Sequence, residues 1–391
     1  MKASIDWMAL GRRMVDQVAA RSPDTVPTVR EEPAGFYTDP GRFVRELKSI
    51  FLRTPLFAAT SAELSEPGDY LALELANVPV MLVRGKDGRV RGFRNTCRHR
   101  GARLLEGSGS GLRAIVCPYH AWSYNSEGRL VGVPSKEFFP GVSAETHSLG
   151  EIQVAEGAGL IFLQIEGSAP LSVEEHLGAE LFAELNAYGW QGWDATNPGS
   201  TKVTANWKLT MDTYGECYHC PVLHRETLPG LAGNLGGLDY YGRHIRQIFV
   251  NKSVRELSTI PESDWQVDKI KNHVAVVYLV YPNLVLATSG DGVQLMTVRP
   301  DSAVDQSLVH QIQLVSPKLP ERIRARLEGF LTANWKDVVC AQDFPIIEGV
   351  WSSLITGGIE RMTFGQNEAA LQHLHASWAA GLEERNSNHD H

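Results

Sequence analysis

The sequence predicts an α+β fold in two domains, a small antiparallel β domain and a larger domain in which helices back an antiparallel sheet. Its 391 residues are enough for two or three hydrophobic cores of ordinary size. Short apolar runs separated by turn residues fill residues 55–168, whereas residues 169–391 mix strands with long helical segments. Residues 1–54 have helical character and are expected to form an arm that packs with the second domain.

The N-terminal arm is predicted to contain two helices. Apolar residues recur at helical spacing through Ile5–Ala20, and Ser22-Pro23 ends that pattern because proline cannot continue a helix. A second helical stretch follows near Arg42–Phe51.

The small domain is predicted to be a meander of antiparallel strands. Turn residues such as Lys86-Asp87-Gly88 and Asn125–Gly128 separate its apolar runs. The expected strands are Tyr70–Leu75, Val78–Val83, Val90–Phe93, Ala114–Val116, Trp122–Tyr124 and Leu160–Gln164.

The larger domain is predicted to begin with a helix over Leu171–Tyr188. Two further helices, Asn367–Leu382 and one running from Pro320 through Asp337 and beyond, come after a set of strands. The expected strands are Val274–Val280, Leu284–Ala287, Gln294–Val298 and Ser307–Val315.

Composition and charge exclude several classes of protein. Hydrophobic residues make up 43% and charged residues 21% of the chain, as in an ordinary globular protein. Because 37 basic residues face 45 acidic ones, the net charge is −8, and nucleic acid is not an expected partner. Met1–Ser22 lacks the apolar core of a secretory signal, and no stretch approaches the roughly 18 apolar residues that span a bilayer. We therefore expect a cytoplasmic protein without a membrane segment.

Two cysteine–histidine pairs form the first candidate site. Cys97-Arg98-His99 and Cys117-Pro118-Tyr119-His120 are separated by 17 residues, and four such ligands in two short loops indicate a metal site. A structural zinc ion accepts two thiolates and two imidazoles. A two-iron, two-sulfur cluster with two cysteines on one iron and two histidines on the other uses the same set. The remaining cysteines of the five, Cys217, Cys220 and Cys340, are expected to be structural and unpaired, because a cytosolic chain rarely forms disulfides.

A second candidate site lies in Asn206–His224. In a continuous helix, Asp212, Glu216 and His219 would share one face, at spacings i, i+4 and i+7. Pro221 is expected to bend or end that helix, so that His224 converges with His219. Two histidines and a carboxylate on one face of Fe(II) leave positions open for dioxygen.

These segments resemble a known family. Cys97–Ala102 and Cys117–Tyr124 are similar to the two cluster-binding loops of Rieske proteins, and Asn206–His224 is similar to the iron-binding motif of Rieske non-haem iron oxygenase α subunits. Weaker resemblances in Tyr281–Leu284 and Asn367–His375 extend the likeness over nearly the whole chain. The resemblance implies a Rieske domain followed by a catalytic domain of the helix-grip, START-like type.

The resemblance also implies the cofactors and their ligands. Cys97, His99, Cys117 and His120 would hold one [2Fe–2S] cluster, and His219 and His224 would bind one mononuclear Fe(II). The family's third iron ligand is an aspartate late in the chain, for which Asp343 is the best match and Asp337 and Glu348 are alternatives. Asp212 and Glu216 are the expected catalytic carboxylates, with Glu216 hydrogen-bonded to His219.

By the same resemblance, the chain is the terminal oxygenase component of a system in which NAD(P)H supplies electrons through a separate flavin and iron–sulfur reductase, sometimes through a ferredoxin. A separate reductase is expected because the chain has no Gly-x-Gly-x-x-Gly nucleotide loop. The family forms head-to-tail homotrimers and hydroxylates or oxidatively demethylates small organic substrates, often in aromatic hydrocarbon catabolism. The alternative is a Rieske electron carrier fused to a ligand-binding domain without oxygenase chemistry.

The substrate is less constrained by the sequence. Glu216 stands where many ring-hydroxylating members have aspartate, as in the subgroup that acts on carnitine and betaines. Tyr240, Tyr241 and Trp351 are candidates for an aromatic surface that binds a quaternary ammonium, although packing is the stronger interpretation. For the apolar residues near the expected pocket, a place in the core is likewise the stronger interpretation; these residues are Leu231, Val277, Leu286, Met296 and Phe364.

Overall fold

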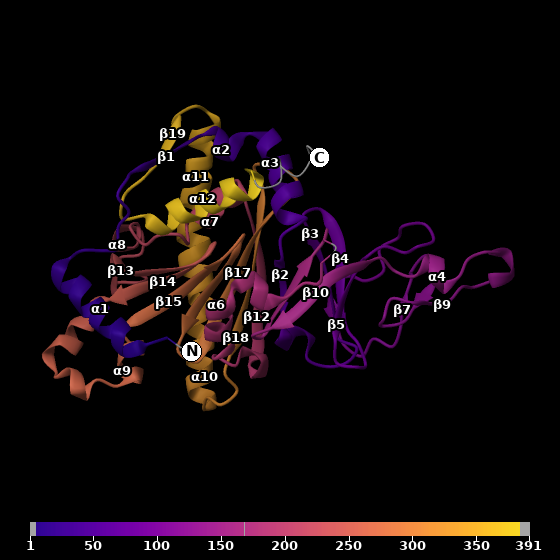
Figure 1. The fold of residues 1–391 in the computed structure, drawn as a ribbon, viewed down its shortest axis with the longest axis horizontal. Coiled ribbons are helices and arrows are strands. Elements are labelled where there is room, and N and C mark those ends of the chain that lie inside the picture. The colour runs from indigo at the N-terminus through magenta and orange to yellow at the C-terminus, as the bar shows by residue number, and fades with distance from the viewer. Residues whose placement is uncertain (1–4, 168, 384–391) are drawn as a thin grey trace. The chain divides into compact units, whose positions relative to one another are not determined.

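A computed structural model describes residues 5–167 and 169–383 and divides the chain into two compact units. The large unit is built from segments 1–50, 177–188 and 193–391, and the small unit from segments 51–176 and 189–192. Both units combine helices with antiparallel sheets, as the α+β prediction requires (Figure 1).

The small unit contains two antiparallel sheets. The first has seven strands in the order β2-β11-β10-β5-β4-β3-β6, and the second has three in the order β7-β8-β9. The strands are β2 (Leu56–Thr60), β3 (Tyr70–Leu75), β4 (Val78–Arg84), β5 (Val90–Arg94), β6 (Ser108–Gly109), β7 (Ile115–Val116), β8 (Ser123–Tyr124), β9 (Leu130–Gly132), β10 (Glu151–Gly157) and β11 (Leu160–Gln164). Its helices are short: η2 (Ser61–Leu64), η3 (Lys136–Phe138), α4 (Ala144–His147), α5 (Val173–Leu177) and η4 (Trp190–Gly192).

One hydrophobic cluster fills the part of the small unit that carries the cysteine–histidine loops. Phe93, Ile115 and Tyr124 are fully buried in this cluster. Cys97 and Cys117 belong to it as well, each only 3% exposed. Both cysteines are therefore enclosed by apolar side chains.

The large unit is organised around one seven-stranded antiparallel sheet in the order β12-β18-β17-β16-β15-β14-β13. A separate pair, β1-β19, joins two segments that are far apart in the sequence. The strands are β1 (Arg30–Pro33), β12 (Asp194–Val203), β13 (Leu231–Tyr241), β14 (His244–Asn251), β15 (Val274–Val280), β16 (Leu284–Ser289), β17 (Gly292–Pro300), β18 (Ser307–Val315) and β19 (Arg361–Phe364).

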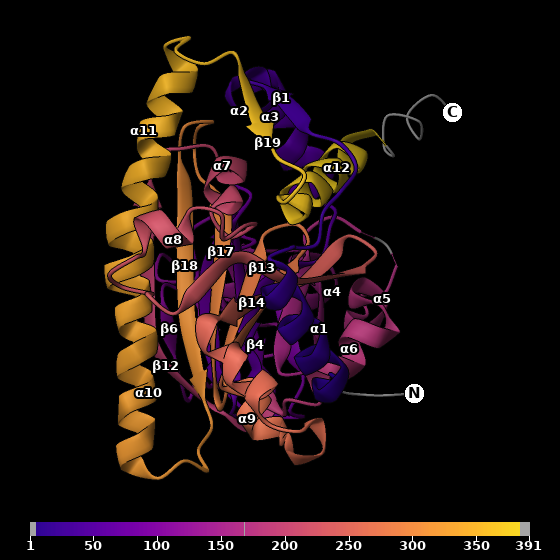
Figure 2. The same cartoon turned by 90° about the vertical axis from the view of Figure 1, so that its left-hand side faces the viewer.

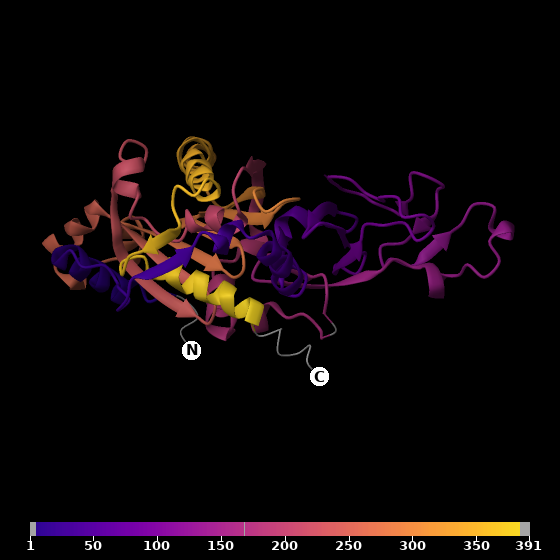
Figure 3. The same ribbon diagram turned by 90° about the horizontal axis from the view of Figure 1, so that it is seen from above.

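A long helical column crosses one face of this sheet. It consists of α10 (Glu321–Ala333), the π-helical segment η7 (Asn334–Asp343) and α11 (Phe344–Ile355), as Figure 2 shows in gold. Seen from above in Figure 3, the column is viewed nearly end-on beside the sheet. The other helices of this unit are α1 (Trp7–Ala20), α2 (Gly35–Thr38), α3 (Pro40–Glu46), η1 (Leu47–Phe51), α6 (Ala179–Asn186), α7 (Trp207–Asp212), α8 (Cys220–Leu223), η5 (Lys252–Thr259), η6 (Glu262–Asp264), α9 (Val267–Lys271) and α12 (Ala369–Glu383).

By length and composition alone, the continuous helical stretch Glu321–Ile355 would be able to cross a membrane. Instead it packs on β17 and β18 through α10, and its central segment contributes side chains to a cavity described below.

The N-terminal arm packs with the large unit through a buried ion pair. Nζ of Lys208 lies 2.6 Å from Oε2 of Glu46, and the indole N–H of Trp207 donates to the same oxygen at 3.0 Å. Lys208 and Glu46 are 1% and 0% exposed, so the buried ammonium depends on this carboxylate, whose other oxygen lies 2.8 Å from Nε of Arg42. Burial, although opposed by Glu46, lowers the pKa of Lys208 to about 8.

One predicted helix needs correction, and two strands of the large sheet were missed. The helix expected over Leu171–Tyr188 is broken into α5 and α6, because Gly178 between them has a φ of +79° that a continuing right-handed helix does not permit. The strands β13 and β14 were not predicted, and β13 contains a shift in pairing register between Leu231 and Gly236 that obscures its alternation.

Candidate metal centres

The two cysteine–histidine loops of the small unit share one backbone design. In each loop the cysteine N–H donates to the carbonyl five residues later, from Cys97 to Ala102 and from Cys117 to Trp122, both at 2.8 Å. Gly101 and Ala121 occupy the fourth position after the cysteine, with φ of +77° and +56°. These left-handed residues reverse the chain, so that each histidine is held beside its cysteine.

The two histidines meet in the interior of this site. The ring centroids of His99 and His120 are 4.8 Å apart, and Trp122 stacks on His99 at an interplanar angle of 8°. The Nδ1 atoms of both histidines are buried, and neither has a hydrogen-bond partner among the described residues. Two buried, unpartnered imidazole nitrogens beside two buried thiols fit a metal cluster, because coordination would satisfy each nitrogen.

Tyr124 supports this site from β8. Its hydroxyl oxygen accepts the N–H of Arg98 at 3.0 Å and lies 3.4 Å from Sγ of Cys97. Burial, together with the contact with Cys97, raises the pKa of Tyr124 well above its usual value, so the phenol stays protonated. Its O–H is thus directed at the sulfur of a candidate ligand.

In the large unit, Asn206–His224 is not the continuous helix that its spacing suggested. Helix α7 ends at Asp212, and a separate one-turn helix, α8, begins after His219. Pro221 lies in the first turn of α8, where proline is tolerated, so it helps to start this helix and does not bend an existing one. His219 and His224 are the two caps of α8, and the single turn between them brings their rings together.

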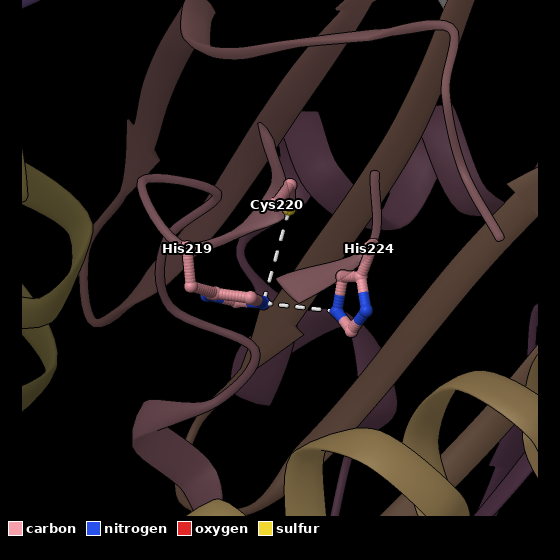
Figure 4. A group of neighbouring side chains, drawn as sticks. All are labelled: His219, Cys220 and His224. Atoms are coloured by element: carbon pink, nitrogen blue, oxygen red, sulfur yellow. Dashed lines mark hydrogen bonds between the residues drawn. The ribbon is translucent and has the colours of Figure 1, made fainter. Parts of the chain in front are cut away.

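Three side chains converge at this point. Nε2 of His219 lies 3.2 Å from Nε2 of His224, and Figure 4 shows the two rings approaching from either end of α8. Oδ1 of Asp343 lies 3.1 Å from Nε2 of His224 and 3.6 Å from Nε2 of His219. Two nitrogens and one carboxylate oxygen therefore face a common point.

The outer nitrogens of both histidines are also engaged. Nδ1 of His219 contacts Oε1 of Glu216, as predicted, and Nδ1 of His224 lies 2.7 Å from Oε1 of Gln342. An acceptor at Nδ1 keeps the proton there and leaves the lone pair of Nε2 free for a metal ion. Although burial lowers the pKa of His224, contacts with Asp343 and Gln342 raise it overall. The sequence interpretation missed Gln342, whose only signal is its place beside Asp343.

The alternatives to Asp343 lie elsewhere. Oε1 of Glu348 accepts the backbone N–H of Thr204 at 2.9 Å, and Asp337 is exposed on the surface of η7. Asp343 is 5% exposed and stands at the end of η7. The structure thus brings Asp343, and neither alternative, to the histidines.

Asp212 does not face the histidine pair. Its two carboxylate oxygens lie 2.5 Å from the hydroxyl of Tyr37 and 2.8 Å from Nε2 of His375, and all three residues are buried. The expected shared face with Glu216 and His219 is wrong, because the helix that would align them ends at Asp212. Asp212 joins the N-terminal arm to α12 and takes no direct part in the candidate metal site.

The structure also corrects the expectation for the cysteines. Cys217 and Cys220 form a disulfide, whereas Cys97, Cys117 and Cys340 are free. Sγ of Cys220 lies 3.8 Å from Nε2 of His219. As a disulfide sulfur, however, it offers no thiolate to a metal, which leaves Asp343 as the anionic member of the site.

A cavity of about 670 Å³ adjoins the three converging side chains. Its walls come from α8, from strands β13 to β17 and from the helical column, and they are largely apolar. Val277, Leu286, Met296 and Phe364 are buried in the core, as expected, and Val277 and Met296 also line the cavity. Leu231 lines the cavity and is only half-buried. Its volume lies in the range of small-molecule sites.

The aromatic residues considered for an ammonium-binding surface do not line this cavity. Tyr240 packs on His373 with ring centroids 4.7 Å apart, and the hydroxyl of Tyr241 donates to Glu184 at 3.4 Å. Trp351 is buried in α11. The aromatic side chains that do line the cavity are Tyr214, Phe249 and Phe330.

Comparison with known families assigns both units. Residues 54–143 match the Rieske [2Fe-2S] domain, and residues 188–384 match the ring hydroxylating alpha subunit (catalytic domain). The chain belongs to the ring-hydroxylating α-subunit family. Its cysteine–histidine loops are therefore those of a [2Fe–2S] domain, which excludes the zinc alternative, and its large unit is of the type that binds mononuclear iron.

Individual members of the ring-hydroxylating α-subunit family are similar to this chain. The carnitine monooxygenase oxygenase subunit of Escherichia coli strain K12 is 34% identical over 195 residues, which cover 49% of this chain and 51% of that protein. The glycine betaine monooxygenase oxygenase subunit of Chromohalobacter salexigens is 31% identical over 222 residues, 55% of this chain and 49% of that protein. The matches thus span about half the length of these relatives.

A solved structure shares the fold over more of the chain. It is that of a quaternary ammonium Rieske monooxygenase, described for carnitine oxidation by gut microbiota and inter-subunit electron transfer. It has a TM-score of 0.75 and 23% identity, and it covers 93% of this chain and 98% of its own. The Rieske and catalytic fold predicted from the sequence is thereby confirmed.

Proposed function

We propose that the protein is the terminal oxygenase component of a multi-protein system, which uses O2 and electrons from a partner reductase to hydroxylate or oxidatively demethylate a small organic substrate. The observation that carries the proposal is the convergence of His219, His224 and Asp343 at the wall of the cavity. Two imidazoles and one carboxylate form the facial triad of non-haem iron oxygenases. An electron carrier fused to an unrelated binding domain would need no such set.

In this proposal Nε2 of His219, Nε2 of His224 and the carboxylate of Asp343 hold Fe(II). The bound iron would supply the activation of dioxygen. The chain's own task is positional: Glu216 and Gln342 orient the imidazoles through their Nδ1 atoms. The apolar cavity walls exclude water and hold the substrate beside the open side of the site.

The [2Fe–2S] cluster would be held by the thiolates of Cys97 and Cys117 and by Nδ1 of His99 and His120. When bound, the cluster would supply one-electron transfer to the iron site. Neutral imidazole ligands raise the reduction potential of such a cluster compared with four thiolates. The O–H of Tyr124 directed at Cys97 acts in the same direction, since it stabilises electron density on sulfur.

We further propose that the protein works as a homotrimer in the cytoplasm, with a flavin and iron–sulfur reductase, and in some systems a ferredoxin, as its electron donor. The inter-subunit electron transfer described for the solved relative supports an oligomer. In a head-to-tail arrangement Glu216, which already contacts Nδ1 of His219, would bridge to His120 of a neighbouring copy.

The proposed substrate class is a carnitine-like or betaine-like amine, with an aromatic acid or aromatic ring as the second candidate. The carnitine and glycine betaine relatives and the glutamate at position 216 favour the amine. A biphenyl dioxygenase α subunit that is 32% identical over 206 residues supports the aromatic candidate. The test is a screen of both compound classes with purified protein and a surrogate reductase, measuring formaldehyde and hydroxylated products. If neither class of compound gave an oxygen-dependent product, the result would contradict the proposed oxygenase function.

The metal assignments have their own test. His219→Ala and His224→Ala should lose mononuclear iron yet keep the visible spectrum of the cluster, because the two sites lie in different units. Cys97→Ser should lose the cluster, because a serine oxygen is a poorly matched ligand for an iron–sulfur core. Unchanged iron content in the histidine variants, or an unchanged spectrum in Cys97→Ser, would contradict the corresponding assignment.

A further inference from the structure

A row of three side-chain amides connects the cavity to the edge of the sheet in the large unit. Nδ2 of Asn334 donates to Oε1 of Gln294 at 2.9 Å, and Nε2 of Gln294 donates to Oε1 of Gln311 at 3.2 Å. Nε2 of Gln311 donates in turn to the backbone carbonyl of Asn197. Gln294 and Gln311 are 0% and 2% exposed, so water does not compete for these bonds.

The orientation of the amides in this relay is determined by the end at Asn197. The carbonyl of Asn197 accepts hydrogen bonds only, which requires Gln311 to present its nitrogen there and its oxygen to Gln294. Nε2 of Gln294 also lies 3.5 Å from the carbonyl oxygen of Leu331, a second group that only accepts. Gln294 must therefore direct its amide oxygen toward Asn334, and Asn334 must donate to that oxygen through its amide nitrogen.

The amide oxygen of Asn334, at the cavity end of the relay, is therefore left without a partner in the relay. Among the described residues, Nδ2 to Gln294 is the one side-chain hydrogen bond of Asn334. Its Oδ1, unlike the hydroxyl of Tyr214, is not among the buried polar atoms that lack a partner, so it is accessible. Asn334 and Gln294 both line the cavity, from the helical column and from β17.

The helix type places Asn334 in line with the candidate iron ligand. In the π-helical segment η7 hydrogen bonds run from residue i to i+5, so residues four or five apart share a face. Asn334, Val338, Val339 and Asp343 follow that spacing, and all four line the cavity. Asn334 is thus two turns from Asp343, with apolar side chains between them.

We propose that Asn334 is a specificity-determining residue whose oriented amide oxygen accepts a hydrogen bond from a hydroxyl or N–H group of the substrate, at the end remote from the reacting carbon. The proposal rests on the proposed function, since it takes the cavity to be the substrate site. The relay makes the residue selective: a freely rotating asparagine would offer an acceptor or a donor equally, whereas this one offers an acceptor.

The test compares probes that differ by one hydroxyl. L-carnitine with γ-butyrobetaine and 3-hydroxybenzoate with benzoate are such pairs, and their binding to the iron- and cluster-loaded protein is measured by calorimetry. In at least one pair we expect the hydroxylated member to bind the wild-type protein about fivefold more tightly, as one neutral hydrogen bond provides. Equal affinities within both pairs, or no binding of any probe, overturn the proposal.

Three variants separate specificity from packing. Asn334→Leu and Gln294→Leu should bring the ratio of affinities close to one, the first by removing the acceptor and the second by removing what orients it. Gln313→Leu is the matched control, because Gln313 is a buried amide that is hydrogen-bonded to the side chain of neither Gln294 nor Asn334. Its partners are Nδ2 of Asn197 and Oγ1 of Thr332, and neither bond involves the Asn197 carbonyl that ends the relay. If Asn334 and Gln294 had only a structural role, all three variants would be less stable and the ratio of the two probe affinities would not change. An unchanged ratio in Asn334→Leu contradicts the proposal.

Turnover distinguishes this inference from the proposed function. Hydroxyl-selective binding that depends on Asn334, without oxygen-dependent product, would retain the inference and reject the oxygenase function. Product formation from both members of a pair, with equal binding affinities, would support the oxygenase function and reject the inference about Asn334.

Discussion

The amide oxygen of Gln342 lies 2.7 Å from Nδ1 of His224, while its chain neighbour Asp343 lies 3.1 Å from Nε2 of the same ring. Consecutive residues of η7 thus contact both nitrogens of one imidazole. The π-helical turn makes this possible, because its wider spacing directs both side chains toward α8. The position and the protonation of His224 are set by a single element.

Replacement of Gln342 by leucine should weaken iron binding by about 10- to 100-fold while leaving all three proposed ligands in place. The physical reason is the loss of the acceptor that keeps the proton on Nδ1 of His224. Competition with an iron chelator measures the affinity. Thr227→Val is the control, since it removes a second donor to the same oxygen, at 3.1 Å, and leaves the imidazole contact intact. Equal affinities in the two variants would rule out this role for Gln342.

Asp343→Ala should lose more mononuclear iron than Asp337→Ala or Glu348→Ala. Of these three carboxylates, Asp343 alone lies within 4 Å of both histidines, so its loss would remove a negative charge from the proposed iron site. Iron per chain, measured after desalting, is the readout. Asp337→Ala is the stricter control because it lies on the same helical segment. Full iron retention in Asp343→Ala would transfer the third ligand to another residue.

Glu216→Gln should keep both metals and lose most turnover, and Glu216→Asp should retain part of it. The amide cannot supply the negative charge that the carboxylate places beside Nδ1 of His219, nor accept from two imidazoles as the proposed inter-subunit bridge requires. Stopped-flow reduction of the cluster followed by its re-oxidation measures the step affected. Rapid re-oxidation with normal product yield would show that Glu216 serves only to cap the turn at Tyr218 and His219, whose N–H groups it also accepts.

Glu46→Gln should destabilise the large unit by about 3 kcal/mol, because it leaves the buried ammonium of Lys208 without its counter-ion. Denaturation followed by tryptophan fluorescence is a suitable readout, since Trp207 donates to the same carboxylate. The double variant Glu46→Leu with Lys208→Met should recover part of the loss, because it removes the unpaired ammonium but not the lost contact of Arg42 with Glu46. Additive losses in that double variant would contradict the coupling.

His310 should make the protein less stable in mild acid. Burial, with the nearby Arg299 as a second cause, lowers the pKa of His310 to about 4 from an ordinary 6.5. The unfolded chain therefore takes up the proton first, and the free energy of unfolding falls as the pH drops from about 6.5 toward 4. His310→Gln should lose this part of the decline. Denaturation midpoints at pH 7.5 and pH 5 provide the comparison, and equal declines in both proteins would refute it.

The sequence predicted the fold where the signal was local. Val274–Val280 and Ser307–Val315 are strands with the predicted bounds, because apolar runs of that length have few alternatives in a sheet. It could not predict β1 paired with β19, since each is four residues long and stable only in the presence of the other. The loops and histidine pairs were recognisable by residue type and spacing. Gln342 and the amide relay were not, because glutamine and asparagine are common and only their orientation makes them informative.

The pairing of β1 with β19 also has a consequence for biosynthesis. The large unit begins before the small unit in the chain and is completed after it, and Glu32 and Tyr37 of the arm contact His375 in α12. During translation β1 and the rest of the arm stay unpaired until β19 and α12 have left the ribosome, whereas every segment of the small unit has been made by residue 192. We infer an order of maturation in which the small unit folds first, and the proposed iron site, which includes Asp343, closes only after the small unit has been made.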